Sequence, residues 1–430
     1  MSRISGIHTP HHKNTATLAP EPIALPLEVR LNMSMHSGTP AKPIVAAGDH
    51  VKAGQLVGEI AGRVSSPVHA SVSGKIKSID EFHPVTGEKA ISIVIQADEE
   101  QVAIDALPVN VSSTPEFLQA VEASGVVGLG GAGYPTAPKL TLKEGTNLDY
   151  IIINGAECEP YITSDTRIMV DETQDVFDGA MMMKKYLSPK QVIIGIEDNK
   201  PEAIKKLEDL CKTVSGVSVH VLPSHYPQGE RKVLVYNVTG RIVPEGGRLT
   251  DVGCIVINCT TVAVFARYIK TGMPLTHRII TVDGSAVKNP KNVIAPIGTS
   301  IKLLFEHCGG LFDEAKIIMG GPMMGQAVPS TEMPTTKIIN AVLALNKEDS
   351  KLPVTTACIK CGRCIEKCPI NLMPSFIEDA FERRDIDMLN KLKVNMCAEC
   401  GCCAYLCPAK RPLAHVMVLS KNMQWEARQK

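Results

Sequence analysis

Two cysteine runs near the carboxyl end of the 430-residue chain constrain its fold more than any other feature. The first reads C-I-K-C-G-R-C-I-E-K-C-P from Cys358, and the second reads C-A-E-C-G-C-C-A-Y-L-C-P from Cys397. Both have the spacing C-x2-C-x2-C-x3-C-P of a cubane iron–sulfur site, in which the fourth cysteine usually ligates the other run's cluster. The spacing therefore predicts two [4Fe–4S] clusters. Their ligand sets are Cys358, Cys361, Cys364 and Cys407 for the first, and Cys397, Cys400, Cys403 and Cys368 for the second.

Other uses of these cysteines fit the pattern less well. Structural zinc sites usually take separated C-x2-C pairs, without a fourth cysteine before proline. Disulfide frameworks belong to small secreted domains. Cys402 fits neither ligand set and is interpreted as a structural thiol packed beside a cluster. A helix over about 375–392 is expected to connect the two runs.

Composition limits the remaining functions. The chain has 45 basic and 45 acidic residues and only 4% aromatic residues, so neither charge nor stacking indicates a nucleic-acid partner. No stretch reaches the roughly 18 apolar residues of a membrane span, and the amino-terminal residues lack the apolar core of a signal peptide. Free thiols together with iron–sulfur clusters suggest a reducing cytoplasm. The length suggests about three or four domains.

The first 98 residues are expected to form an arm and a small β-barrel. His8, His11 and His12 lie in the arm, where packing or solvation is favoured over metal binding. The rhythm G-D-x-V-x-x-G-Q followed by P-V-x-A-x-V-x-G-x-I is similar to biotinyl and lipoyl barrels. Such carriers need a modifiable lysine at a hairpin tip. Here the tip runs from Ala61 to Val64 without one, which favours a structural or docking barrel.

A glycine-rich loop follows a predicted helix at 115–124. It reads G-V-V-G-L-G-G-A-G-Y-P-T-A-P-K, and Gly128, Gly130 and Gly133 satisfy G-x-G-x-x-G. A dinucleotide fingerprint needs a strand before the loop and an uninterrupted helix after it, whereas here a helix precedes and prolines follow. The loop is instead expected to let a flat or phosphate-bearing ligand approach the backbone, with Lys139 placed to neutralise a phosphate.

Downstream, strands alternate with helices. Strands are predicted at 150–154, 191–197 and 217–222, and helices at 172–187 and 201–214. This alternation indicates a parallel α/β sheet, which binds ligands at the carboxyl ends of its strands. The segments N-G-A-E-C-E-P (154–160) and H-Y-P-Q-G-E (225–230) lie at such ends.

The stretch 275–325 is expected to form a small β-grasp-like module of two strands and a helix. G-G-P-M-M-G (320–325) is interpreted as a tight turn beside a packing surface, and the following segment as a linker to the cluster domain. The expected domains are 1–98, 112–268, 272–330 and 350–415.

With these segments identified, the chain resembles the C subunits of Rnf electron-transport complexes over nearly its full length. Its middle domain is similar to the flavoprotein subunit of respiratory complex I. The resemblance implies a multidomain α/β and α+β protein. Its parts would be a lipoyl-like barrel, a Rossmann-like FMN and NADH domain, an SLBB-like β-grasp module and a ferredoxin-like helical domain with two clusters.

The resemblance also implies site residues, by motif position. In the loop from Gly128 to Lys139, the residues that would bind FMN are Gly128, Gly130, Gly131, Gly133 and Lys139. Asn154 and Glu157 would contact the flavin, and Tyr134 and Glu159 would lie on the nicotinamide side. Tyr226, Gly229 and Glu230 match the family's Y-x-x-G-E segment, and Asn258 and Thr260 match its N-N-x-E-T region. The chain departs from complex I at Leu129, Ala156 and Cys259.

The implied reaction is hydride exchange between NAD(H) and FMN, with clusters that carry single electrons and no acid–base residue. Implied partners are membrane subunits, a ferredoxin-like iron–sulfur subunit and, indirectly, ferredoxin. The expected location is the cytoplasmic face of the membrane. Two alternatives remain open: a soluble NADH-dependent reductase similar to cobalamin reductases, and a non-enzymatic iron–sulfur adaptor.

Overall fold

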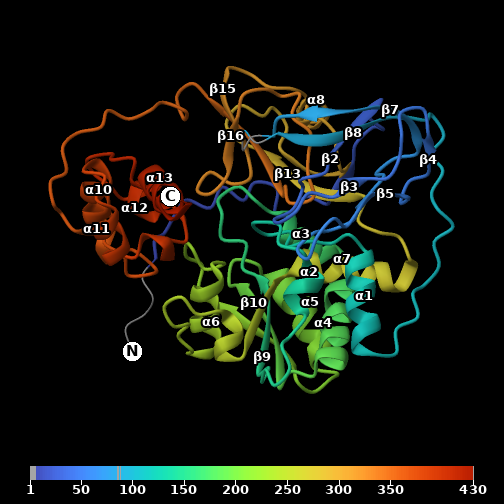
Figure 1. The fold of residues 1–430 in the computed structure, drawn as a ribbon, viewed down its shortest axis with the longest axis horizontal. Helices are drawn as coiled ribbons and strands as arrows, with labels where there is room; N and C mark the ends of the chain where they lie inside the picture. Colours follow the sequence, from blue (N-terminus) through green and yellow to red (C-terminus); the bar gives the residue numbers. More distant parts are fainter. Residues whose placement is uncertain (1–5, 85–86, 88, 430) are drawn as a thin grey trace.

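The computed structural model describes residues 6–84, 87 and 89–429, so the first five residues of the expected arm lie outside it. Its strands form four sheets within the described residues. Figure 1 shows the barrel and the six-stranded sheet above the α/β domain, with the carboxyl-terminal helices as a separate group at one side. None of the described helices is long and apolar enough to cross a membrane.

The centre of the middle domain is a four-stranded parallel sheet of order β11-β10-β9-β12. Its strands are β9 (Tyr150–Gly155), β10 (Gln191–Glu197), β11 (Val217–Leu222) and β12 (Cys254–Asn258). The runs of isoleucine and valine are buried because helices cover both faces of the sheet. The three strands predicted from the sequence and their parallel pairing are confirmed.

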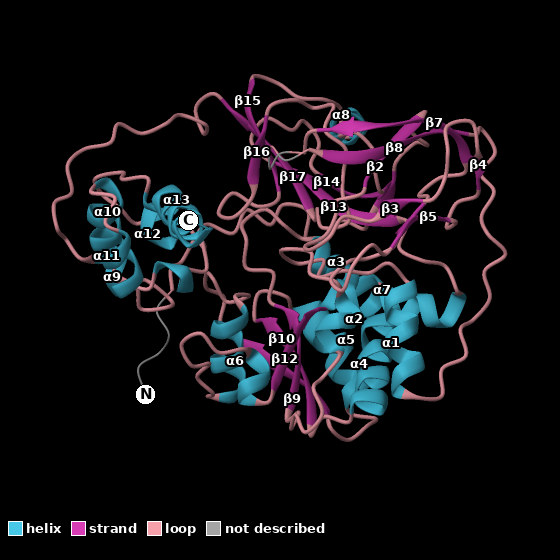
Figure 2. Cartoon of the chain, viewed as in Figure 1, coloured by secondary structure: helices cyan, strands magenta, loops and turns pink. Residues whose placement is uncertain are grey.

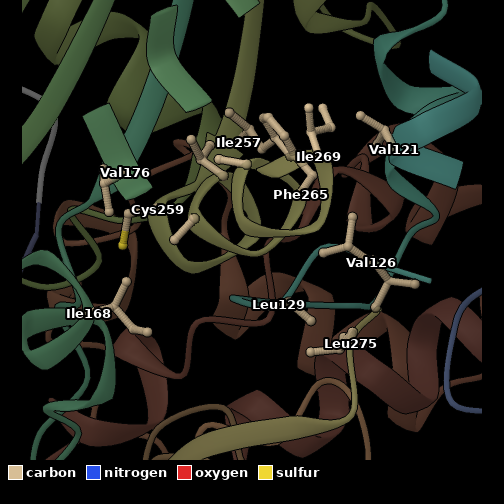
Figure 3. Close-up of a cluster of buried hydrophobic side chains, with 14 of the residues drawn as sticks. Val121, Val126, Leu129, Ile168, Val176, Ile257, Cys259, Phe265, Ile269 and Leu275 are labelled. Atoms are coloured by element: carbon tan, nitrogen blue, oxygen red, sulfur yellow. The ribbon is translucent and has the colours of Figure 1, made fainter. Parts of the chain in front are cut away.

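The helices form two layers around this sheet, as Figure 2 shows. One layer contains α1 (Thr114–Ala123), α4 (Thr173–Leu187), α5 (Pro201–Cys211) and α7 (Cys259–Thr271), and α6 (Arg231–Thr239) covers the other face. Ser113 and Glu116 form a capping box at the start of α1. The main hydrophobic core surrounds α7, where Cys259 lies near Ile168 and Val176 (Figure 3).

The amino-terminal barrel consists of two antiparallel sheets. One contains β2 (Glu28–Asn32), β8 (Ala90–Ala97), β7 (Gly74–Phe82) and β4 (His50–Val51), in this order. The other contains β3 (Lys42–Pro43), β5 (Leu56–Glu59) and β6 (Val68–His69). Alternating apolar residues, such as Val29 and Leu31 on β2, point into the barrel core.

The third module is a six-stranded sheet of order β1-β14-β13-β17-β15-β16. These strands are β1 (Glu21–Pro22), β13 (His277–Asp283), β14 (Lys291–Pro296), β15 (Glu314–Met319), β16 (Gln326–Val328) and β17 (Ala341–Asn346), with helix α8 (Ile301–His307). The expectation of a linker after residue 325 is wrong for β17, which pairs with both β13 and β15. Its first four residues are fully buried, because the sheet needs an apolar central strand.

The cluster domain is helical. It contains α9 (Arg363–Glu366), α10 (Pro374–Glu382), α11 (Ile386–Lys391), α12 (Cys402–Tyr405) and α13 (Leu413–Gln429), with a 3-10 turn, η2 (Val394–Met396). The single connecting helix predicted over 375–392 is wrong, because the chain breaks between α10 and α11 at Arg384, whose φ is +55°. The long helix α13 packs on both α10 and α11.

Candidate functional site

The glycine loop connects α1 to a short helix, α2 (Thr136–Leu140), which begins directly after Pro135. Pro138 is accommodated because the first turn of a helix needs no backbone donor there. The loop is closed by a hydrogen bond from the Gly128 N–H to the Tyr134 carbonyl (2.9 Å). It is fastened to α7 by the Leu129 N–H, which donates to Thr261 Oγ1 (3.0 Å).

The glycines of this loop serve different physical purposes. A Cβ at Gly130 would lie 2.5 Å from Asn258 Nδ2, and one at Gly133, where φ is +66°, would lie 2.7 Å from Ile338 Cγ2. Both positions therefore require glycine for packing. A Cβ at Gly131 would meet nothing within 4 Å, so the loop backbone there is open to a ligand.

Beside the loop lies an open cleft of about 1270 Å³. Ala132, Tyr134 and Lys139 line it from the loop and α2, and Ile255 and Val256 line it from the edge strand β12. The size is sufficient for a flavin and part of a second nucleotide, since ligand pockets typically span about 300–1,000 Å³. Of the residues implied by the resemblance, Tyr134 and Lys139 are the ones that line this cleft.

The cleft is cationic. Its lining includes two acidic side chains, Glu122 and Asp251, and five basic ones: Arg63, Lys139, Lys143, Arg231 and Arg248. Among the described residues none of these five forms an ion pair. Burial, with a smaller effect of the Arg231 guanidinium, lowers the pKa of Lys139 to about 8. An excess of unpaired cations around an apolar floor suits a phosphate-bearing aromatic ligand such as FMN.

Asn258, Thr260 and Glu157 form a network inside the protein instead of lining the cleft. Asn258 Nδ2 and Thr260 Oγ1 donate to the two carboxylate oxygens of Asp165 (2.7 and 2.6 Å). The Glu157 carboxylate accepts from the Asp165 N–H (2.6 Å) and from Thr166 Oγ1 (2.5 Å), at the start of α3 (Ser164–Asp171). Burial raises the pKa of Glu157. The network fixes the end of β12 against α3.

A second set of the implied residues lies at the carboxyl end of β9. Asn154 Nδ2 donates to the Gly229 carbonyl (3.0 Å), which joins β9 to the turn before α6. Glu230 caps α6, because its carboxylate accepts from the N–H groups of Lys232 (2.7 Å) and Val233 (2.9 Å). The next residue, Arg231, is the first residue of α6 and lines the cleft. The cap at Glu230 therefore helps to position it.

Glu159 and Tyr226 contact other domains. The Tyr226 hydroxyl donates to the Cys400 carbonyl (2.8 Å) and is fully buried. Glu159 Oε2 accepts from the Met323 N–H (3.1 Å) in the turn at 320–325, and burial raises the pKa of Glu159 to about 7. Tyr226, Met323, Cys400 and Cys402 belong to one apolar cluster, so this turn does pack against a surface.

The cysteines of the second predicted set lie together. Cys368, Cys397, Cys400 and Cys403 line one cavity in the cluster domain, and buried Cys402 lines it too. Within the described residues no three histidine, cysteine, aspartate or glutamate side chains are arranged to hold a single metal ion. Five thiols line this cavity, of which the four of the predicted set suit a group of several atoms, because sulfurs that ligate one ion must lie closer together. The residues present therefore fit an iron–sulfur cluster.

The first predicted set is partly assembled. Cys364 and Cys407 are buried in one apolar cluster, although they belong to different cysteine runs. Cys358 and Cys361 are exposed, in a segment without regular secondary structure. The proximity of Cys364 and Cys407 agrees with the predicted exchange of fourth ligands, and the ligand roles stay a prediction.

Sequence reasoning missed Lys13, Arg63, Arg231 and Arg248. Lys13 Nζ donates to the carbonyls of Glu157 (2.8 Å), Glu159 (2.9 Å) and Ile162 (2.5 Å). Arg231 follows the Y-P-Q-G-E segment directly, and this adjacency was the one signal available in the sequence. Arg63 had no such signal.

Family models match four consecutive parts of the chain. They are the RnfC barrel sandwich hybrid domain (2–100), the Nuo51 FMN-binding domain (121–267), the SLBB domain (279–327) and the 4Fe-4S dicluster domain (352–408). These matches confirm the predicted fold classes and the predicted FMN and iron–sulfur domains.

Several curated proteins are similar over most of the chain. The C subunit of the proton-translocating ferredoxin:NAD(+) oxidoreductase complex of Clostridium ljungdahlii is 39% identical over 86% of this chain and 82% of its own length. The C subunit of the Na(+)-translocating ferredoxin:NAD(+) oxidoreductase complex of Acetobacterium woodii is 38% identical over 88% and 87%. The C subunit of the ion-translocating oxidoreductase complex of Rhodobacter capsulatus is 35% identical over 89% and 75%.

Among solved structures, an NAD+-reducing [NiFe]-hydrogenase in the air-oxidized state matches with a TM-score of 0.52 and 16% identity. The match covers 74% of this chain but only 63% of the hydrogenase chain. At this identity the likeness is one of fold.

Proposed function

The chain belongs to the family of C subunits of Rnf complexes, and from this membership we propose that it is the electron-transfer subunit of an ion-translocating ferredoxin:NAD+ oxidoreductase. Bound FMN and [4Fe–4S] clusters supply the redox chemistry, since a flavin exchanges two electrons with NAD(H) and single electrons with clusters. The protein supplies binding, orientation and exclusion of water. The hydrogen bond from Tyr226 to Cys400 carries the proposal, because it joins the flavin-type domain to a cysteine-lined cavity.

The nucleotide site is proposed to be the cationic cleft. Lys139 and Arg231 would neutralise phosphate, and Tyr134 would pack against a ring. Gly131 leaves the loop backbone open to the flavin. For Gly128, Gly130 and Gly133 we propose that the loop shape they permit is their contribution. Asn154, Glu157, Asn258 and Thr260 would keep the strand ends in place through their hydrogen bonds. Gly229 and Glu230 would position Arg231 at the cleft. The position of Glu159 beside the nicotinamide stays a prediction.

The second cysteine set is proposed to bind the cluster that receives electrons from the flavin. It adjoins Tyr226 of the middle domain and the turn at 320–325, which contacts the middle domain through Glu159. The first set is proposed to bind the cluster that exchanges electrons with a partner protein, because Cys358 and Cys361 are exposed. Large apolar side chains are exposed in the chain segment that contains Cys358: Leu352 and Val354 at 85%, and Ile359 at 65%.

We propose that this exposed apolar surface docks the complex's ferredoxin-like iron–sulfur subunit, since an electron can leave only where the two proteins' clusters approach. Ferredoxin would then be reached indirectly. Membrane subunits would carry the ion translocation and hold this chain at the cytoplasmic face of the membrane.

Anaerobic purification followed by reconstitution with iron, sulfide and FMN tests the proposal. We expect two [4Fe–4S] clusters, one FMN and reduction of a viologen dye by NADH. A protein with clusters but neither FMN nor NADH oxidation would be an electron adaptor, and the proposed function would fail. Full activity with soluble acceptors but no association with membrane subunits would favour a soluble reductase.

A further inference from the structure

The hairpin between β5 and β6 of the barrel reaches the nucleotide cleft. This hairpin contains the segment Ala61–Val64, the position at which carrier barrels present a modified lysine. Arg63 and Val64 line the cleft, together with Ser37 from the neighbouring turn of the barrel. In Figure 1 the barrel lies on the side of the middle domain where α1 and α2 are found. The barrel is therefore a wall of the cleft.

Hydrogen bonds connect the hairpin to the glycine loop through the neighbouring turn that contains Ser37. The Ser37 N–H donates to the Gly133 carbonyl (3.0 Å), and the Ser37 hydroxyl donates to the Ala132 carbonyl. On the other side of the same turn, the Thr39 N–H donates to the Val64 carbonyl (2.8 Å). A Cβ at Gly38, where φ is +100°, would lie 2.2 Å from that carbonyl oxygen, so the turn and the hairpin are in close contact. The hairpin backbone next to Arg63 is thus connected to the loop through this turn.

The Arg63 side chain is exposed and forms no hydrogen bond or ion pair among the described residues. It differs in this from Arg30 of the same barrel, which is paired with Asp80 (2.6 Å). Lys139 is half-buried, and Arg231 lies close enough to it to affect the pKa of Lys139. The cleft therefore has one group of cations beside α2 and α6 and a separate cation on its barrel wall.

We propose that Arg63 binds the diphosphate of the nicotinamide dinucleotide, so that the barrel forms part of the substrate site. A resident flavin takes the less exposed part of the cleft beside Lys139, whereas an exchangeable substrate has to enter from solvent. A guanidinium is the side chain best suited to two adjacent phosphates, because its donors form a planar fork. This inference rests on the proposed function, since it assigns a residue to the same site.

The test measures binding of NADH and of ADP-ribose to the reconstituted, FMN-loaded full-length protein. ADP-ribose has the diphosphate but lacks the nicotinamide ring, and its binding requires no electron transfer. Arg63→Gln should weaken the binding of both ligands by roughly tenfold, which is the effect expected when a charged hydrogen bond is lost. FMN content and iron content should stay unchanged. Arg63→Lys should recover part of the affinity, and the difference from wild type should shrink at high salt.

Lys75→Gln is the matched control, because Lys75 is an exposed cation of the same barrel that does not line the cleft. It should bind both ligands as the wild type does. The inference is overturned if Arg63→Gln binds both ligands normally, if it weakens NADH but not ADP-ribose, or if it lowers the FMN content. If the wild type binds no NADH at all, the proposed function itself fails and this inference falls with it.

Discussion

Lys13 is a largely buried cation whose hydrogen bonds hold the segment 157–162. A buried ammonium group is costly unless its donors are satisfied, and here three carbonyls and the nearby Glu157 carboxylate satisfy them. Burial nevertheless lowers the pKa of Lys13. The segment needs such support, because Glu157 and Tyr161 both have positive φ angles, at 47° and 68°. At the scale of single residues, much of the site's polarity therefore maintains backbone shape.

The cysteine assignment makes a prediction for iron content. Cys364→Ser should remove the first cluster and leave about half of the iron, because Cys364 is buried with Cys407 and does not line the cavity of the second set. FMN content and flavin reduction by NADH should be unchanged. Iron analysis and electron paramagnetic resonance measure the loss. Cys402→Ala is the control and should keep all the iron. Loss of flavin in Cys364→Ser would mean that the two domains do not bind their cofactors independently.

The hydroxyl of Tyr226 makes a second prediction. Tyr226→Phe leaves the Cys400 carbonyl without its donor, which should cost about 1 kcal/mol of stability. Because this bond joins the two domains, cluster reduction after mixing with NADH should slow, while flavin reduction keeps its rate. Stopped-flow absorbance separates the two phases. Tyr405→Phe, at a residue 45% exposed, is the control. Unchanged cluster reduction in Tyr226→Phe would contradict the proposed route.

At the scale of elements, the barrel, the middle domain and the third module meet around Lys337. Lys337 Nζ donates to the carbonyls of Pro67 (2.5 Å) and Gly125 (2.7 Å), and the side chain is 1% exposed. Two buried histidines of the barrel, His36 and His69, lie near enough to feel its charge. A junction of three domains thus contains three titratable groups in a setting that favours their neutral forms.

This junction predicts sensitivity to acid. Burial, with the Lys337 charge adding to it, lowers the pKa of His36 to about 4 and of His69 to about 3. The unfolded chain takes up these protons near pH 6.5, so the free energy of unfolding should fall as the pH drops below 6.5. The loss should be about 2 kcal/mol per histidine by pH 4.5. Urea unfolding of His69→Gln across this range should show a shallower decline than the wild type. Equal slopes would refute the assignment.

The three departures from the complex I pattern are explained by packing of the elements. Leu129, Ala156 and Cys259 are all fully buried, and Leu129 and Cys259 lie in the main core around α7. Figure 3 shows both side chains among the aliphatic residues of that core. Cys259 in place of an asparagine therefore concerns the packing of α7 against α3 and α4.

At the scale of the whole molecule, the amino-terminal arm connects parts that are distant in sequence. Ile7 pairs with Tyr226 beside the cluster domain, Lys13 holds the loop after β9, and β1 extends the six-stranded sheet. The cluster domain in turn contacts the middle domain through Tyr226 and the third module through Met323. The order of the segments along the chain does not reveal these contacts.

A shortened chain that ends at residue 349, three residues after β17, tests whether the domains are separable. It should keep FMN and NADH binding, because the cleft lies outside the cluster domain, and it should contain no iron. Its melting temperature should fall, because the apolar contacts of Tyr226 and Met323 become exposed. Full-length protein purified without iron is the control, since it separates loss of the clusters from loss of the domain. Failure to bind flavin would show that the cluster domain is needed to shape the cleft.

The sequence by itself determined the two-cluster domain, the parallel sheet and the position of the glycine loop, and it predicted the cluster ligands. Each depends on local spacing: thiols with two or three residues between them, apolar strands of about six residues, and glycines within one turn. The domain boundaries and the roles of the individual site residues stay predictions. Only the tertiary structure decided that Arg63, Tyr134 and Arg231 line one cleft, and that β17 completes a sheet. The physical reason is that these contacts join segments far apart in the chain, and no periodicity in the sequence encodes such pairings.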